Sequence, residues 1–61
     1  MSSLLIVGPG RLGGYIAFRA LQLGLVETVF LAGRTESRTF GIARDLQEAF
    51  PDQEIVTLKS Y

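Results

Sequence analysis

The feature that most constrains this chain is a cluster of glycines placed directly after a short apolar run. Residues 4–7 are all aliphatic, and the run stops at a turn that contains Gly8, Gly10 and Gly13. A short aliphatic run closed by glycines is typical of a strand buried on both faces of a parallel sheet. Residues 11–23 then show apolar side chains at helical spacing. We therefore predict a strand, a glycine turn and a helix, in that order.

The remainder of the chain alternates between the same two patterns. Residues 28–32 are β-branched and aromatic at their start, and residues 54–58 form a similar run, so both are predicted strands. The segment between them is predicted to be a helix that ends at about Phe50. Thr35 and Ser37 are alternative N-cap residues for this helix.

Each predicted helix has an apolar stripe that we expect to face the sheet. In the first helix, four residues at helical spacing form the stripe: Leu12, Ile16, Ala20 and Leu23. In the second helix, the corresponding residues are Phe40, Ala43, Leu46 and Phe50. Gly24 has the place of the C′ residue that ends the first helix.

The order of these elements predicts an α/β fold. Strands that alternate with helices are parallel and are joined by right-handed crossovers. The expected structure is half of a Rossmann fold, a three-stranded parallel sheet in βαβαβ order with two helices, forming one partial domain over residues 1–61. Both helices of such a half lie on one face, whereas a parallel sheet is normally covered on both. We expect further chain of a larger protein, or another copy in a homo-oligomer, to cover the open face.

The glycine turn also predicts a chemistry. Gly8, Gly10 and Gly13 fit the pattern G-x-G-x-x-G, which binds a dinucleotide when a strand precedes it and a helix follows. Gly8 permits the tight turn, Gly10 lets a pyrophosphate approach the backbone, and Gly13 allows close packing of helix on strand. The N–H groups of Arg11 and Leu12 can then donate to phosphate oxygens. The alternative is a turn that needs glycine for steric reasons only.

The end of the second strand indicates which dinucleotide would bind. Sites for NAD have an acidic residue about 20 residues after the glycines, but this chain has Gly33 there, followed by Arg34. The missing carboxylate removes a repulsion of a 2′-phosphate, and a guanidinium suits that phosphate. Three further residues supply hydroxyl or cationic groups: Thr35, Ser37 and Arg38. These residues favour NADP over NAD as the cofactor.

An alternative interpretation leaves this turn without a ligand. Arg34 and Arg38 would then be solvated and would pair with Glu27 and Glu36. Glu36 also suits the first turn of the second helix, where the helix dipole favours negative charge.

Three blocks of sequence resemble the N-terminal part of the lactate/malate dehydrogenase family. They are the glycine motif, residues 24–31 (Gly-Leu-Val-Glu-Thr-Val-Phe-Leu), and residues 41–49 with the pair Asp45-Leu46 in their middle. The spacing of the blocks matches the family without a gap. The resemblance covers nearly the whole chain but only the first part of a family member. The NAD-selecting Asp of the family aligns with Gly33, and its NADP-using members lose that acid.

The resemblance implies the cofactor-binding part of an NADP-dependent dehydrogenase, an oxidoreductase that transfers a hydride between nicotinamide and a 2-hydroxy or 2-oxo acid. The family's catalytic His and substrate-binding Arg align with no residue here, and the chain contains no His. We therefore expect no catalytic residue in this chain. Two other functions stay open: a non-catalytic, regulatory NAD(P)-binding module and an inactive structural fragment.

Composition and charge narrow the classes of partner. Six basic and six acidic residues give no net charge, which argues against a nucleic-acid surface. No apolar run reaches the length of about 18 residues that a membrane span needs. Without Cys or His the chain has no disulfide and no ordinary zinc ligands. No signal-peptide pattern is present, so the cytoplasm is the expected location, with an organelle as the alternative.

Overall fold

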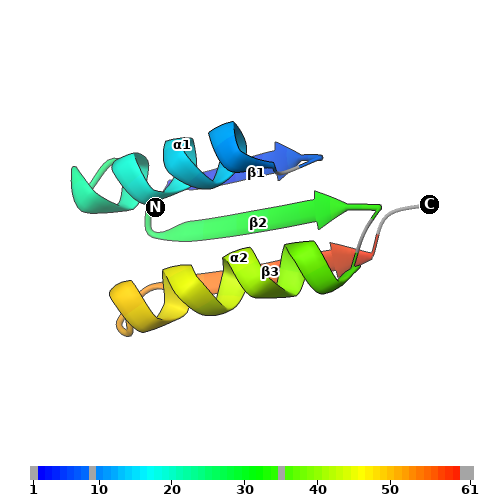
Figure 1. Ribbon diagram of the computed structural model, residues 1–61. Helices are drawn as coiled ribbons and strands as arrows, with labels where there is room; N and C mark the ends of the chain where they lie inside the picture. The colour runs from blue at the N-terminus through cyan, green and yellow to red at the C-terminus, as the bar shows by residue number, and fades with distance from the viewer. Residues whose placement is uncertain (1, 9, 35, 60–61) are drawn as a thin grey trace.

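The computed structural model describes residues 2–8, 10–34 and 36–59 (Figure 1). It contains five elements: β1 (Ser3–Val7), α1 (Arg11–Gln22), β2 (Thr28–Gly33), α2 (Glu36–Ala49) and β3 (Glu54–Lys59). All predicted elements are present. The three strands and α1 differ from their predicted ranges by one residue each.

The three strands form one parallel sheet in the order β1-β2-β3. Thr28 of β2 lies opposite Ser3 of β1 and opposite Glu54 of β3, and the register continues along each pair without a break. All three strands therefore end at the same edge of the sheet, as the arrowheads in Figure 1 show. The predicted α/β fold with βαβαβ order is confirmed, and the strand order is that of one half of a doubly wound sheet.

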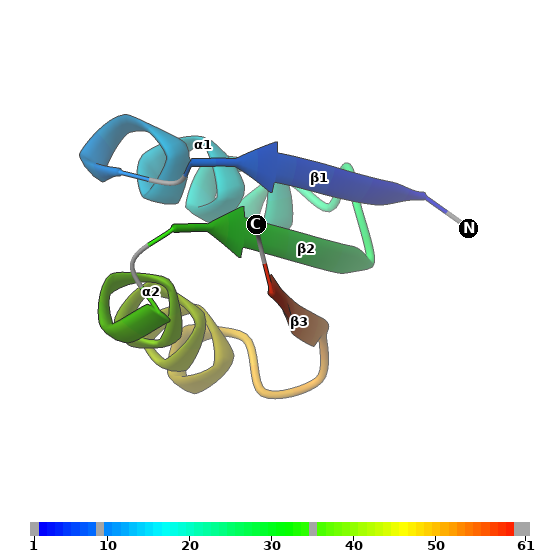
Figure 2. The ribbon, with the colours of Figure 1, turned by 90° about the vertical axis from the view of Figure 1, so that its right-hand side faces the viewer.

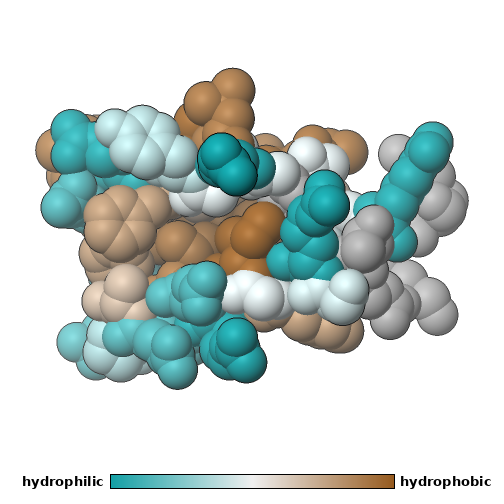
Figure 3. Space-filling model, in the orientation of Figure 1, coloured by the Kyte–Doolittle hydropathy of each residue, from teal (hydrophilic) through white to brown (hydrophobic). Residues whose placement is uncertain are grey.

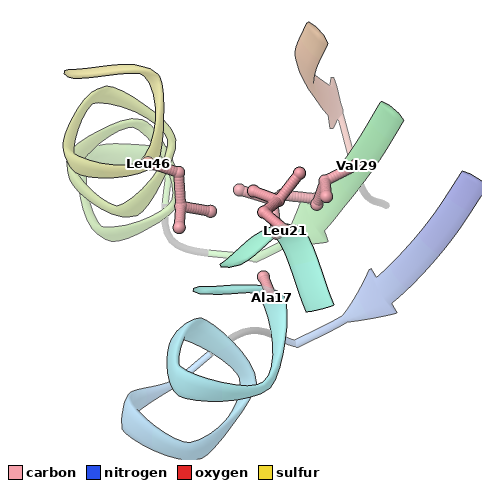
Figure 4. Packing of buried hydrophobic residues seen from close by; sticks show 5 residues of the cluster. Ala17, Leu21, Val29 and Leu46 are labelled. Atoms are coloured by element: carbon pink, nitrogen blue, oxygen red, sulfur yellow. The ribbon is translucent and has the colours of Figure 1, made fainter. Parts of the chain in front are cut away.

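Both helices cover the same face of the sheet (Figure 2). The core lies between them and the central strand, where α1, α2 and β2 contribute five buried side chains: Ala17, Leu21, Val29, Leu31 and Leu46 (Figure 4). Within the described residues, no element covers the opposite face of the sheet. The prediction that both crossovers share one face is thus confirmed.

The buried side of α1 differs from the predicted one. Ala17 (0% exposed) and Leu21 are buried in the core. Three of the four residues predicted to face the sheet are exposed instead: Leu12, Ile16 and Leu23. At about 100° per residue, these three project from the side of the helix roughly opposite Ala17 and Leu21. The helix is apolar on two opposite sides, and the side with the smaller residues is the one that packs.

The predicted stripe of α2 is largely confirmed. Leu46 is buried, and Ala43 and Phe50 pack against the core. Phe40 is 56% exposed, so its predicted place in the core is wrong, and Thr39 is buried instead. Phe40 precedes Leu46 by six residues, which places it about 120° away around the helix.

The C-terminal end of α1 has the geometry that its sequence predicts. Gly24 has a φ of +72°, a left-handed conformation that favours glycine. Its N–H donates to the carbonyl oxygen of Leu21 at 3.1 Å, and the N–H of Leu25 donates to that of Ala20 at 2.9 Å. These two hydrogen bonds form a Schellman motif, which confirms Gly24 as the C′ residue.

The two ends of α2 differ from the ends of α1 in the groups that form hydrogen bonds there. The helix begins before Ser37, so Ser37 is not its N-cap, and Thr35 lies outside the described residues. At the C-terminal end, the Nε2 of Gln47 donates to the carbonyl oxygens of Phe50 at 3.2 Å and of Gln53 at 2.7 Å. The N–H of Gln53 also donates to the carbonyl oxygen of Phe50 at 3.1 Å, so a side chain and a main-chain group together hold the turn that follows α2.

Candidate functional site

The candidate site lies at the edge where the parallel strands end. Gly8 follows β1, and its N–H donates to the carbonyl oxygen of Ala32 in β2 at 2.6 Å. This hydrogen bond extends the ladder between β1 and β2 by one residue and holds the glycine turn against the end of β2. Both helices begin at the same edge (Figure 1). The structure thus brings together two segments that are far apart in the sequence.

Gly8 has a conformational reason to be glycine. Its φ of +69° lies in the left-handed region, where a side chain costs about 1–2 kcal/mol. A Cβ placed on Gly8 meets no atom within 4 Å, so the reason is the backbone and not crowding. The turn out of β1 favours Gly8 whether or not a ligand binds.

Within the described part of the chain, neither the backbone conformation nor crowding requires glycine at Gly10. It is the N-cap of α1 and has extended torsion angles, with φ −120° and ψ −152°. A Cβ placed on Gly10 also meets no atom within 4 Å. The space beside its backbone is therefore open, as a ligand that approaches the main chain requires.

The start of α1 provides main-chain donors next to Gly10. The first helical hydrogen bond runs from the N–H of Gly14 to the carbonyl oxygen of Gly10 at 2.9 Å. The N–H groups of Arg11, Leu12 and Gly13 come before this bond and have no acceptor within the helix. Gly10 has no side chain that could cap them, and the first turn contains no acidic residue. This helix end favours a bound anion through its N–H groups and its dipole.

The two glycines inside α1 lie on its partly buried side. A Cβ on Gly14 would lie 3.6 Å from the Cγ2 of Ile42 in α2, which is an ordinary contact distance. Gly14 thus faces the second helix, and an alanine methyl would fit there. Gly13 is partly buried, and its role in close packing on the strand stays a prediction.

The end of β2 supplies the second part of the site. Gly33 is the last residue of the strand and has no side chain at the position where NAD sites carry a carboxylate. Arg34 follows it and is exposed, and Ser37 and Arg38 are exposed in the first turn of α2. Thr35, the remaining predicted contact, lies outside the described residues. One hydroxyl and two guanidinium groups are therefore accessible close to where β2 ends.

The alternative pairing of these arginines with Glu27 is wrong. Glu27 comes directly before β2, where its N–H donates to the carbonyl oxygen of Ser2 at 3.0 Å. Arg34 and Arg38 follow the other end of that six-residue strand, which is about 20 Å long. This separation is far beyond the reach of an ion pair. The side chain of Glu36 lies outside the described part of the chain, so its pairing stays an open alternative.

Sequence reasoning missed an apolar component of this region. Leu12, in the first turn of α1, is 72% exposed, and Phe40, early in α2, is also exposed. Both residues fit a helical stripe and were therefore assigned to the core. Ligand sites combine apolar surface with a few polar groups, so an exposed Leu12 at a helix start whose first N–H groups have no acceptor within the helix is compatible with a ligand site.

Within residues 2–8, 10–34 and 36–59, no group of His, Cys, Asp and Glu side chains is arranged to hold a metal ion. Neither helix in this part of the chain combines the length and the apolar character needed to cross a bilayer. The candidate site consists of main-chain donors, glycines, and basic and hydroxyl side chains.

Comparison with known proteins does not reveal a relative. No model of a known protein family matches the chain, and no curated protein matches it. The resemblance to the lactate/malate dehydrogenase family therefore stays a prediction that rests on the three sequence blocks alone.

Proposed function

We propose that the chain binds a nicotinamide dinucleotide at the edge of the sheet where the strands end. The observation that carries this proposal is Gly10, which neither its torsion angles nor its surroundings require to be glycine. A pyrophosphate beside Gly10 would use the open space at its backbone. It would also accept hydrogen bonds from the first N–H groups of α1, which have no acceptor within the helix, and the helix dipole would favour its charge.

We propose further that NADP is preferred over NAD. Gly33 presents no carboxylate to a 2′-phosphate, and Arg34 directly after it presents an exposed guanidinium. Ser37 and Arg38 offer further donors from the first turn of α2. Hydrogen bonds between a guanidinium and a phosphate are charge-assisted, so a few of them can decide between the two cofactors.

The larger activity that the resemblance to the lactate/malate dehydrogenase family supports is that of a 2-hydroxy-acid oxidoreductase, of which the chain would be the cofactor-binding part. A bound nicotinamide dinucleotide would supply the hydride in such a reaction. The residues of this chain would bind and orient the cofactor: Gly8, Gly10, Arg11, Leu12 and Gly13 around the pyrophosphate, and Gly33, Arg34, Ser37 and Arg38 around the adenosine ribose. The groups that move protons and hold the substrate would come from outside this chain.

Calorimetric titration of the chain with NADPH, NADH and 2′-phospho-AMP tests the proposal. We expect both ligands with a 2′-phosphate to bind, and NADPH to bind roughly tenfold or more tightly than NADH because of the charge-assisted contacts. Absence of binding by all three ligands would contradict dinucleotide binding. Equal binding of NADPH and NADH would contradict the NADP preference alone.

The variant Arg34→Ala tests the source of that preference. We expect it to weaken NADPH binding roughly tenfold and to leave NADH binding nearly unchanged, since only NADPH carries the 2′-phosphate. Arg44→Ala is the matched control, because Arg44 is an exposed arginine farther along α2. An equal loss of NADPH and NADH binding in Arg34→Ala would mean that Arg34 acts elsewhere.

A further inference from the structure

The two edges of the sheet carry different charged side chains. Arg34 and Arg38 lie close to where β2 ends, and Arg11 begins α1 at the same edge. Glu27 and Glu54 lie at the opposite edge, where the N–H of Glu54 donates to the carbonyl oxygen of Glu27 at 3.3 Å. The six residues of β2, about 20 Å, separate the two groups. The exposed arginines therefore stand well away from these two carboxylates.

Two more charged residues belong to the edge where the strands end, and the side chains of both lie outside the described part of the chain. Lys59, the last residue of β3, is opposite Gly33. Glu36, the first residue of α2, is the only acidic residue between Gly33 and Asp45. Asp45 follows Arg38 by seven residues, which is about 10 Å along the helix. Among the acidic residues, Glu36 is therefore the one that the sequence puts nearest to the two arginines of α2 and the end of β2.

The side-chain types at this edge keep their charge between pH 5 and pH 7. Arginine stays protonated throughout this range, lysine ordinarily does so too, and a carboxyl group ordinarily gains its proton below the range. The side chain that ordinarily titrates within it is that of His, and the chain contains none. The charge that this edge presents to a ligand is therefore nearly constant from pH 5 to pH 7.

A 2′-phosphate, by contrast, changes its charge in this range. The second pKa of a phosphate monoester is about 6, so the share of the dianion falls from about nine tenths at pH 7 to about one tenth at pH 5. The dianion attracts a guanidinium more strongly than the monoanion does, because the Coulomb energy scales with the charge. NAD has no 2′-phosphate, and the pyrophosphate that it shares with NADP keeps its charge.

We propose that pH sets how strongly this site prefers NADP, because the preference declines as the 2′-phosphate gains its second proton. This inference rests on the proposed function, since it requires the 2′-phosphate to lie beside Arg34 and Arg38. Binding of the dianion lowers the pKa of the phosphate below its value in solution, as linkage requires. The affinity for NADP is therefore full above that solution value and falls as the pH drops through it, whereas the affinity for NAD stays constant.

Titration calorimetry with NADP and NAD at pH 7 and pH 5, at one ionic strength, tests the inference. The oxidised cofactors carry the same phosphates as NADPH and NADH and survive mild acid. From pH 7 to pH 5 we expect the affinity for NADP to fall roughly fivefold and the affinity for NAD to change less than about 1.5-fold. The titrations with NAD also report any loss of folded chain at the lower pH.

The outcomes separate this inference from the function on which it rests. An NADP preference that is equal at both pH values would overturn the pH dependence and leave the preference itself standing. An affinity for NADP that does not exceed that for NAD at pH 7 would contradict the NADP preference, and the pH dependence would be overturned with it.

The variant Arg34→Ala tests whether the arginines cause the effect. Without this guanidinium, we expect the affinity for NADP to change less than about twofold between the two pH values. Arg44→Ala, at an exposed arginine farther along α2, should keep the fivefold change of the wild type. An undiminished pH dependence in Arg34→Ala would overturn the assignment to the arginines.

Phosphorus NMR of bound NADP gives a readout that does not depend on affinity. The resonance of the 2′-phosphate follows its protonation, and its midpoint in the complex should lie about half a pH unit to one unit below that of free NADP. A midpoint that is unchanged or raised in the complex would overturn the inference.

Discussion

The two crossover units of this chain, β1-α1-β2 and β2-α2-β3, have the same order of strand, helix and strand. They differ in the side chains with which their helices pack on the sheet. The buried side of α1 consists mainly of small residues, such as Gly14 and Ala17, whereas α2 packs with larger ones, such as Ile42 and Leu46. The turn between β1 and α1 contains Gly8 and Gly10, whereas the turn between β2 and α2 contains Arg34. At the start of its helix, one unit therefore has main-chain N–H groups beside a glycine, and the other has exposed charged side chains.

The outer sides of the two helices differ as well. In Figure 3, brown side chains gather between the helices and along the margin of α1, whereas most of the surface over α2 is teal or white. The exposed residues of α2 include Arg44, Asp45 and Glu48, while those of α1 include Leu12 and Ile16. α2 is therefore an ordinary amphipathic helix, and α1 is apolar on its buried side and on much of its exposed side.

Two leucine-to-alanine substitutions in α1 are expected to differ most in their effect on stability, because one removes a buried side chain and the other an exposed one. Leu21→Ala removes a buried side chain and should cost about 2–5 kcal/mol of unfolding free energy, which includes the cavity that it leaves. Leu12→Ala should change the free energy by less than about 0.5 kcal/mol, since Leu12 is exposed. Urea denaturation followed by circular dichroism measures both.

These two variants distinguish the observed orientation of α1 from the one that its sequence pattern favours. If the stripe with Leu12 faced the sheet, Leu12→Ala would be the costly change. A larger loss for Leu12→Ala than for Leu21→Ala would therefore contradict the described packing.

A smaller loss of stability is expected from a substitution at the C-terminal end of α2. Gln47→Ala removes two hydrogen bonds to carbonyl oxygens after α2 and should cost about 0.5–1.5 kcal/mol. Gln22→Ala, at the last residue of α1, is the control, because the side chain of Gln22 accepts a hydrogen bond from Arg19 at the exposed surface. Thermal unfolding of both variants measures the difference. Equal melting temperatures would show that Gln47 does not stabilise the end of α2.

The fold was predictable because its signals are local. A glycine lies at the end of β1 and of β2, and Pro51 comes shortly before β3. The alternation of strand and helix then leaves few topologies for parallel strands. The orientation of α1 was not predictable from periodicity, since Leu12 and Leu21 belong to two apolar sides that satisfy the same spacing. The small residues Gly14 and Ala17 were the available signal, because a helix packs most closely on a side without large side chains.

The sequence predicted that the segments of the candidate site lie together, but not the surroundings of their residues. Parallel strands end at one edge, so Gly8 and Gly33 had to lie near each other. The distance between Glu27 and the arginines also follows from the length of β2, once that strand is known. The open space at Gly10 depends on three-dimensional surroundings, and a sequence pattern does not distinguish it from the backbone requirement at Gly8.

The most direct test of the account is the effect of Gly10→Ala on NADPH binding, measured beside its effect on folding. The described structure tolerates a methyl group at Gly10, so we expect a change in unfolding free energy within about 0.5 kcal/mol. The methyl group would occupy the space of a pyrophosphate, so NADPH affinity should fall roughly tenfold or more. Gly41→Ala, at another uncrowded glycine, should leave binding unchanged. NADPH affinity that survives Gly10→Ala in a folded chain would contradict the account.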